Sequence, residues 1–205
     1  MSKRGDEMMQ DSKNGLLDGV KTTVAKFGLV DFSTRKLSEV TGINNGLIYH
    51  YFHSIEEVLF LAYCKENGAI FNAMIHQIDE IHNAPLDFEM KLRLWFHKTW
   101  REFLSDPDRL EFCTAYYHSI YFKSAEDFHA EQVKKLVTRY GSYFKTEAEC
   151  VQVMYSLLTL LYDSAKRVTD GSSPDTPETE EIIFSLFYGM LSSQLKAEDE
   201  HYNII

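Results

Sequence analysis

The residues whose types could do chemistry gather in segment 33–53, where polar and aromatic side chains recur at helical spacing. If the end of this segment is a helix, one of its faces carries Asn45, Leu47, Tyr49 and His50 outward. Asn can pair bidentately with adenine, and Leu can contact the methyl group of thymine. A polar surface that exposes a leucine needs a partner, and this chemistry favours the major groove of DNA.

Two short helices joined by a glycine turn would hold that face in place. Ser33 can cap the first helix, and Leu37 and Val40 recur at the spacing of its buried side. Gly42 stands where the chain must leave this helix, and glycine adopts a positive φ there without strain. The pattern therefore predicts a first helix that ends at this glycine.

The second helix would begin at Asn44 or Asn45, because either side chain can cap it. Ile48 and Phe52 lie four residues apart and would point back to the core. Ile43 would fill the gap between the two helices. The order of caps, turn and outward face predicts a helix-turn-helix.

Composition indicates a folded chain with no membrane span. The 205 residues are 44% apolar and 14% aromatic, which is ample for one or two packed domains. No stretch approaches the roughly 20 apolar residues that cross a bilayer, and no apolar targeting segment follows the charged start. Cys64, Cys113 and Cys150 are too far apart for a metal knuckle, and their number fits no disulfide framework. We expect a cytoplasmic protein with reduced, mostly buried cysteines.

The formal net charge of −10 is unevenly distributed. Residues 1–53 hold seven Lys or Arg and six Asp or Glu, a net of +1, whereas residues 54–205 hold 14 and 25, a net of −11. The acidic groups therefore lie away from the predicted helix-turn-helix. A net of +1 is still a weak footprint for phosphate binding, so we expect modest affinity unless two copies bind one duplex together.

Capping signals and helical spacing recur throughout the chain, and alternating strand patterns are missing, so we predict an all-α fold of about nine helices. Residues 1–53 would form a three-helix DNA-binding domain, and residues 54–205 a larger helical domain for ligand binding and dimerisation. Helices outside the helix-turn-helix are expected at about 12–27, 54–81, 85–105, 110–122, 124–144, 149–167 and 178–197, with Ser124 as one cap and a loop at 170–176. The first of them would bury Leu16 and Val20, and capping-box patterns open two others, at 54–57 and 146–149.

The pattern STRKLSEVTGINNGLIYHYF, a capped helix directly after it and an all-helical remainder resemble the TetR family of transcriptional regulators. The resemblance is specific over about residues 12–65 and only architectural beyond them. It implies a homodimer whose last two helices pair with their mates in a four-helix bundle. It also implies an internal ligand pocket and release from an operator when a ligand binds.

Carried over by position, the resemblance assigns DNA contacts to nine residues. It places two at the start of the first short helix, four on the major-groove face and three on the phosphate backbone, namely Thr34 and Arg35, then Asn44, Asn45, Gly46 and Leu47, then Tyr49, His50 and Tyr51. Arg can pair bidentately with guanine, and a glycine permits close approach of the backbone. Lys36, beside them, is either a phosphate contact or a solvated side chain.

Several of these assignments have an alternative. Many family members carry a basic residue where this chain has Ile55, and Glu56 and Glu57 follow, which would repel a DNA backbone that they faced. Leu47 belongs to the core if the helical phase is misjudged, and Tyr49 could be a partly buried ring. His50 and His53 could be solvated. Docking and affinity depend on how these side chains lie.

Two further groups of residues are candidates for the second domain. An aromatic cluster could line a ligand cavity, because such cavities are mainly apolar with a few placed polar groups; its members are Trp95, Trp100, Phe112, Tyr116, Tyr117 and Tyr121. The same spacing also fits plain core packing. His97 and His118 could orient a polar group or sit in the core. Candidates for the dimer interface are Leu157, Leu161, Ile183, Phe187, Met190 and Leu191.

The sequence thus predicts a ligand-responsive DNA-binding regulator, a repressor released from a pseudo-palindromic operator by a small molecule. The alternative is a helical ligand-binding or protein-interaction module whose DNA binding is weak or lost. No glycine loop for phosphate, HExxH motif or nucleophile elbow indicates an enzyme, and no metal or cofactor is expected. The effector, the operator and the regulated genes have no signal in the sequence.

Overall fold

The computed structural model describes residues 3–195, with side chains described from residue 11 onward. Within this range the chain is helical, as predicted, and a single isolated antiparallel bridge joins Phe144 and Leu195. The described residues form nine α-helices and two 3-10 helices, which are α1 (Lys3–Phe27), α2 (Thr34–Thr41), α3 (Asn45–Tyr51), α4 (Ile55–His82), α5 (Phe88–Ser105), α6 (Pro107–Tyr117), η1 (Ile120–Ala125), α7 (Glu126–Tyr140), η2 (Gly141–Tyr143), α8 (Glu147–Thr169) and α9 (Pro177–Ser192).

Local capping explains where several helices begin. The Asp106 carboxylate accepts the Arg109 N–H at 3.0 Å and caps α6, whose first residue is Pro107. Thr146 and Glu149 form the predicted reciprocal capping box at the start of α8, with N···O distances of 3.2 and 3.1 Å. These side chains satisfy N–H groups that a helix start leaves unpaired, which is why the sequence marks these boundaries.

Several predicted boundaries were wrong. The helix expected at about 110–122 is α6, which ends at Tyr117, and the short helix η1 follows it. α1 begins at Lys3 rather than near Ser12. Ser124 does not cap α7, because it lies inside η1, where its hydroxyl donates to the Tyr121 carbonyl at 2.8 Å. α7 then ends at Tyr140 rather than near residue 144. The expected end of the last helix, at Ala197, lies outside the described residues, and α9 ends at Ser192.

The chain forms two compact units. Unit 1 extends to Ala69 and includes Asp106–Glu126, whereas unit 2 consists of Ile70–Ser105 and the chain from Asp127 onward. α4 therefore contributes its first half to unit 1 and its second half to unit 2. Unit 1 extends beyond the predicted boundary after residue 53, because α6 packs against α1.

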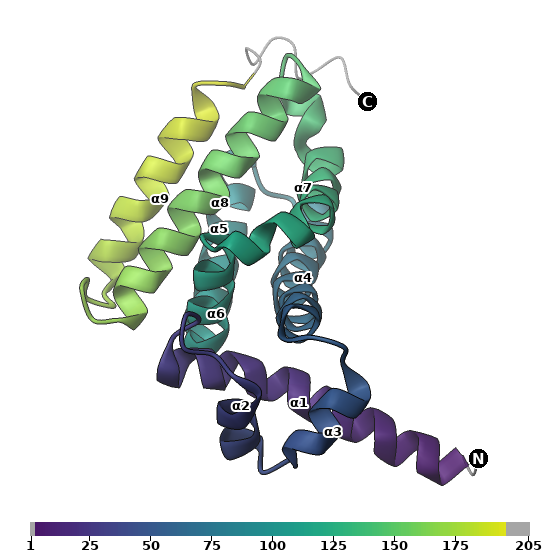
Figure 1. Ribbon diagram of the computed structural model, residues 1–205. Helices are drawn as coiled ribbons and strands as arrows, with labels where there is room; N and C mark the ends of the chain where they lie inside the picture. The colour runs from purple at the N-terminus through teal and green to yellow at the C-terminus, as the bar shows by residue number, and fades with distance from the viewer. Residues whose placement is uncertain (1–2, 196–205) are drawn as a thin grey trace. The chain divides into compact units, whose positions relative to one another are not determined.

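Within unit 1, α2 packs against α1, and α3 packs beside α2 (Figure 1). The buried stripe of α1 includes Leu16 and Val20, both 0% exposed, as predicted. A Cβ atom at Gly19 would overlap Cγ2 of Thr41, so α1 and α2 approach each other closely at this glycine. Because Gly19 has no side chain and Thr41 has a small one, the backbones of α1 and α2 can lie close together here.

A buried ion cluster joins α1, α4 and α6 in unit 1. Glu66 of α4 has a side chain only 4% exposed, and its Oε2 accepts from Arg109 Nε at 2.9 Å and lies 3.5 Å from Lys21 Nζ. Lys21 also pairs with Asp106. A buried carboxylate is tolerated only when such partners compensate its lost hydration.

Unit 2 is built on an antiparallel pair, α8 and α9, with α5 packed against both (Figure 1). Phe96 of α5 contacts two α9 rings, Phe184 and Phe187, with centroids 5.3 and 5.4 Å apart. The indole of Trp95 donates to the Met74 carbonyl of α4 at 3.0 Å. Aromatic packing therefore holds α5 between the second half of α4 and the α8–α9 pair.

Cys113 and Cys150 are buried and Cys64 is partly buried, all as free thiols, as predicted. None of the helices in the described part of the chain is long and apolar enough to cross a membrane.

Candidate nucleic-acid interface

The first helix of the candidate interface is set by its two ends. Ser33 has extended backbone, and its hydroxyl accepts the Lys36 N–H at 3.3 Å, which caps α2. At the other end Gly42 has φ of 69°, and its N–H donates to the Ser38 carbonyl. Leu37 is 0% exposed, whereas Val40 is only partly buried. The predicted helix and glycine turn are confirmed.

α3 begins with a second cap. Of the two asparagines that could cap it, Asn44 does so, because its Oδ1 accepts the Gly46 N–H at 2.7 Å. Ile48 and Phe52 are 1% and 2% exposed and anchor the helix to unit 1, as predicted. Ile43 is partly buried between the helices.

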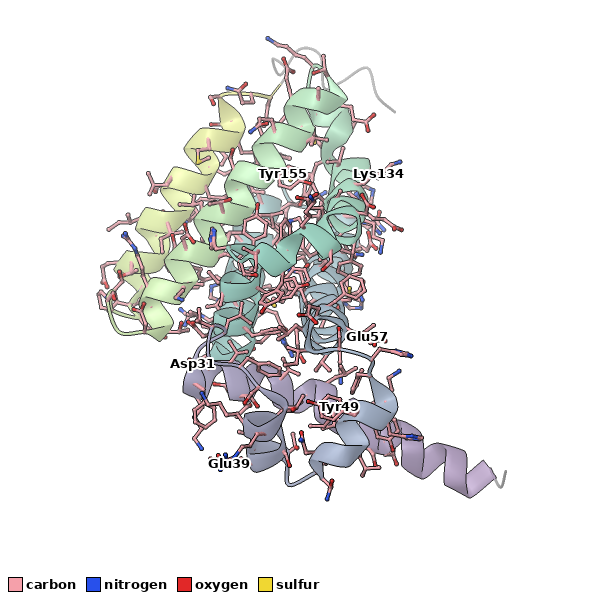
Figure 2. All side chains as sticks on the ribbon, in the orientation of Figure 1. Asp31, Glu39, Tyr49, Glu57, Lys134 and Tyr155 are labelled. Atoms are coloured by element: carbon pink, nitrogen blue, oxygen red, sulfur yellow. The ribbon has the colours of Figure 1, made fainter. Side chains whose placement is uncertain are left out.

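The opposite face of α3 is free of the protein core. Leu47 is 41% exposed and Tyr49 60% exposed, so neither residue belongs to the core. Asn45 and His50 are also exposed. Figure 2 labels Tyr49 on this unit, and all four side chains keep a substantial part of their surface exposed in the described part of the chain. The polar and aromatic face expected from the sequence is present.

The first residues of α2 differ in how free they are. Arg35 is exposed and has no ion pair with a described residue. Thr34, by contrast, is 6% exposed, and its hydroxyl lies 3.2 Å from the Tyr49 hydroxyl. The ammonium of Lys36 donates to the Asp31 carbonyl at 2.9 Å, which leaves it two further donors for water or for a phosphate.

The Thr34–Tyr49 contact joins the start of α2 to α3, and no sequence pattern indicated it. It places the phenol of Tyr49 next to the N-terminus of α2, where helix N–H groups favour an anion. A phosphate bound at the N-terminus of α2 would meet both the Tyr49 phenol and the helix N–H groups. Thr34 could then act mainly by orienting Tyr49, because so little of its own surface is exposed.

The start of α4 carries two carboxylates and no cation. The Glu57 carboxylate accepts the His53 N–H at 2.6 Å and contacts its ring Nδ1 at 2.9 Å. These bonds from His53 lower the pKa of Glu57. Glu56 is exposed, Ile55 is partly buried, and His53 keeps 95% of its side chain in solvent. The Glu57 carboxylate is thus bonded to His53 of its own chain. Glu56 is the carboxylate that a DNA backbone approaching the start of α4 would meet.

The aromatic residues proposed for a ligand cavity are divided between the two units. Trp95 lines described cavities of unit 2, and Trp100 is 1% exposed in the same unit. The other four belong to unit 1: Phe112, Tyr116, Tyr117 and Tyr121. Tyr116 is 0% exposed and its ring stacks on Tyr63 at 4.4 Å. Core packing therefore accounts for most of the cluster, which was the alternative interpretation.

The two histidines that could orient a polar group are not core residues. His97 is exposed and contacts Glu180 of α9 at 2.5 Å, and His118 is exposed at the end of α6. Among the described residues no His, Cys, Asp and Glu group could hold a metal ion.

Five of the six candidate dimer residues are buried within the chain itself: Leu157, Leu161, Ile183, Phe187 and Leu191, all at most 7% exposed. Met190 is 38% exposed. It continues a row with Ile182 and Leu186, which are 62% and 54% exposed, at i, i+4 and i+8 along α9. We call these three residues the α9 stripe. Most of the residues chosen for the dimer interface therefore face the chain's own core, on α8 and on α9.

No protein-family model matches the chain, and no curated protein matches it either. Solved structures do. The all-α architecture, with a helix-turn-helix in its first part, is the fold of TetR family transcription regulators.

A TetR family transcription regulator from Marinobacter aquaeolei VT8 has a TM-score of 0.68 at 17% identity, covering 96% of this chain and 100% of its own. A TetR-like transcriptional regulator from Rhodococcus sp. RHA1 has a TM-score of 0.64 at 13% identity, covering 88% and 96%. The fatty acid degradation regulator FadR from Bacillus halodurans has a TM-score of 0.61 at 15% identity, covering 87% and 97%. At these identities the likeness is one of fold.

Proposed function

We propose that the chain is a TetR-family transcriptional regulator that binds double-stranded DNA as a homodimer and leaves it when a small molecule binds. Residues 1–53 would contact the operator, and residues 54–205 would hold the ligand and the second copy. One observation carries the proposal: a capped α3 exposes Asn45, Leu47 and Tyr49 beside the unpaired Arg35. The fold shared with known regulators over 96% of the chain supports it.

Each exposed group has a role in this proposal. Asn45 and Leu47 would read base edges, because amide and methyl contacts distinguish A·T pairs in the major groove. Arg35 would contact a guanine or a phosphate. Tyr49, His50 and Tyr51 would contact the backbone and fix the register, since phosphate contacts position a protein without specifying sequence.

The dimer would use the α9 stripe. An exposed row of Ile182, Leu186 and Met190 is costly in water and is the kind of surface that a second copy covers. In a two-fold dimer the same patch serves both copies. In a dimer, the DNA-binding domains of the two copies would together compensate for the weak positive charge of residues 1–53, because their phosphate contacts add.

Ligand control would act through the spacing between the DNA-binding domains of the two copies in the dimer. Half-sites on one face of a duplex lie roughly 34 Å apart, so a small change in spacing abolishes simultaneous binding. α4 belongs to both units of the chain and is the element through which a ligand would act. Thermodynamic linkage requires that DNA weakens ligand binding by the factor by which the ligand weakens DNA binding.

The decisive experiment is selection of binding sites from a random duplex pool with the full chain, at low and at high salt. Arg35→Ala is compared with Arg167→Ala, which removes the same charge from an exposed position on α8. We expect the wild type and Arg167→Ala to enrich one palindrome that Arg35→Ala cannot enrich.

Two outcomes would contradict the proposal. If no sequence is enriched and only weak salt-sensitive binding remains, the chain is a helical interaction module rather than a sequence reader. If Arg35→Ala enriches the palindrome as well as the wild type does, the contact surface is not the face of α2 and α3 described above.

A further inference from the structure

Unit 2 contains a cavity of about 130 Å³ that none of the candidate sites includes except through Trp95. It lies where the end of α4, the start of α5 and the end of α7 meet. Its lining is mainly apolar and aromatic, with a few polar groups among the residues Ile78, Ile81, His82, Phe88, Lys91, Leu92, Trp95, Arg139, Tyr140, Ser142 and Tyr143. We call it the α4–α5–α7 cavity.

Aromatic rings build the walls of this cavity. Phe88 and Tyr143 pack with ring centroids 4.9 Å apart, and Trp95 meets Tyr140 edge to face at 6.2 Å. Trp95 and Tyr140 also line a second, wholly apolar space of about 10 Å³. A cavity of about 150 Å³ with apolar walls accommodates one benzene molecule, so the space available suits one six-membered ring or a short branched chain.

Two cations line the cavity, and their surroundings differ. Arg139 is neutralised, because its Nε and Nη2 contact the Asp79 carboxylate at 2.9 and 3.0 Å and its Nη1 donates to the Lys135 carbonyl. Lys91 contacts no carboxylate among the described residues. Its ammonium donates to the His82 carbonyl at 2.7 Å, which leaves it two further donors.

Tyr140 supplies a second polar group. Its hydroxyl forms no hydrogen bond with a described residue, although the side chain is partly buried. Burial raises the pKa of this phenol, so it stays protonated and remains a donor at neutral pH. This hydroxyl is not among the buried side-chain atoms that lack a partner, so it keeps contact with solvent and is available to donate to a ligand acceptor.

From this geometry we propose that the α4–α5–α7 cavity binds a small organic carboxylate, whose apolar body lies against Trp95 and whose carboxylate meets Lys91 and the Tyr140 hydroxyl. A charge-assisted hydrogen bond from an ammonium is stronger than a neutral one and selects an anion. The binding itself stands on the cavity alone, and only its role as an effector site depends on the proposed function.

Isothermal titration calorimetry on the full chain tests the proposal with benzoate and with benzamide, which has the same shape and no charge. We expect saturable binding of benzoate and at least tenfold weaker binding of benzamide. Lys91→Met should weaken benzoate binding about tenfold or more, because it removes the charge and keeps an apolar stem. Lys98→Met is the matched control on α5, since Lys98 pairs with Glu80 and does not line the cavity.

Tyr140→Phe provides a second variant, because it deletes only the hydroxyl and preserves the ring packing against Trp95. It should weaken benzoate binding several-fold and leave the far-ultraviolet circular dichroism unchanged. Equal affinity for benzoate and benzamide, no saturable binding of either by the folded protein, or unchanged benzoate affinity in Lys91→Met would each overturn the proposal.

The result is separable from the DNA experiment. Benzoate binding by a chain that enriches no operator would support the carboxylate site and contradict the regulator. Operator enrichment without any carboxylate binding would do the reverse.

Discussion

At the scale of single residues, Glu66 is the most constrained charge in unit 1. Its carboxylate is 4% exposed and shared by Arg109 and Lys21. Glu66→Ala removes the carboxylate that Arg109 and Lys21 share and leaves both cations with Asp106, so it should lower the free energy of unfolding by about 1.5–3 kcal/mol. Urea denaturation followed by circular dichroism measures this.

The control for Glu66 is an exposed acid. Glu39 pairs with Lys26 at 3.2 Å, but both side chains are more than half exposed. Glu39→Ala should change the free energy of unfolding by about 0–1 kcal/mol. Similar losses for both variants would show that burial of the cluster contributes nothing.

His129 gives unit 2 a dependence on pH. Burial lowers its pKa from 6.5 to about 4, and its ring packs edge to face on Phe71 at 5.6 Å. The folded chain holds this histidine neutral, whereas the unfolded chain protonates it below pH 6.5. The stability due to the neutral ring is therefore fully present above pH 6.5 and is lost as the pH falls toward 4.

The size of the change in stability follows from the shift in the pKa of His129. Between pH 7 and pH 5 the free energy of unfolding should fall by about 2 kcal/mol through this group. His129→Phe keeps an aromatic ring beside Phe71 and cannot titrate, so it should flatten this part of the pH profile. Parallel profiles of the wild type and the variant, measured by urea denaturation at each pH, would rule out the assignment.

At the scale of helices, Gly42 ends α2 with φ of 69°, and no atom lies within 4 Å of where its Cβ would stand. Substitution therefore changes backbone strain and causes no clash. Gly42→Ala should cost about 1–2 kcal/mol of unfolding free energy, and Gly42→Asn less, because Asn tolerates the left-handed region. Equal losses in the two variants would mean that the turn and not φ sets the stability.

Local chemistry made much of the fold predictable. Ser33, Gly42 and Thr146 mark helix ends because each satisfies or relaxes backbone groups within four residues along the chain. The Ser54 segment was only half correct. The Glu57 N–H does bond to the Ser54 hydroxyl at 3.1 Å, but the Glu57 carboxylate turns to His53. A local pattern identifies donors and acceptors, and tertiary geometry selects among them.

Contacts distant in sequence could not be predicted from the same patterns. The ion cluster around Glu66 joins residues 43 and 45 positions apart, and no periodicity links them. The candidate interface was predictable for the opposite reason, because Ile48 and Leu47 differ in helical phase within one short helix. The Thr34–Tyr49 contact depends on how α2 and α3 pack, so it was missed.

At the scale of the whole molecule, we expect a dimer held by the α9 stripe. Leu186 is 54% exposed in the single chain, and Leu186→Asp would place a charge in the centre of the interface. The dissociation constant of the dimer should rise at least tenfold, since burying a leucine contributes about 1.5–3 kcal/mol. Analytical ultracentrifugation should show the wild type near twice the 23.8 kDa of one chain.

Ala130→Asp is the control for the dimer, because it adds the same charge to an exposed position on α7. It should leave the dissociation constant unchanged. A wild type that sediments as a monomer, or a Leu186→Asp variant that still sediments as a dimer, would refute the role of the stripe.

The phase of α8 and α9 explains why five of the six predicted dimer residues are buried within the chain itself. Both faces of α9 are apolar, one against α5 and α8 and the other exposed, so hydropathy alone cannot separate the chain's own core from a surface for a second copy. Only the packing of Phe187 against α5 distinguishes them.

The contact at Gly19 bears on how such a molecule can change over generations. The exposed side chains of α3 can be exchanged at little cost in stability, and under the proposed function such exchanges would give a new sequence preference. Position 19 has no such freedom, since any side chain there collides with Thr41. Gly19 and Thr41 therefore have to change together if they change at all. An engineer who retargets this scaffold should vary the exposed surface of α3 and leave Gly19 and Thr41 unchanged.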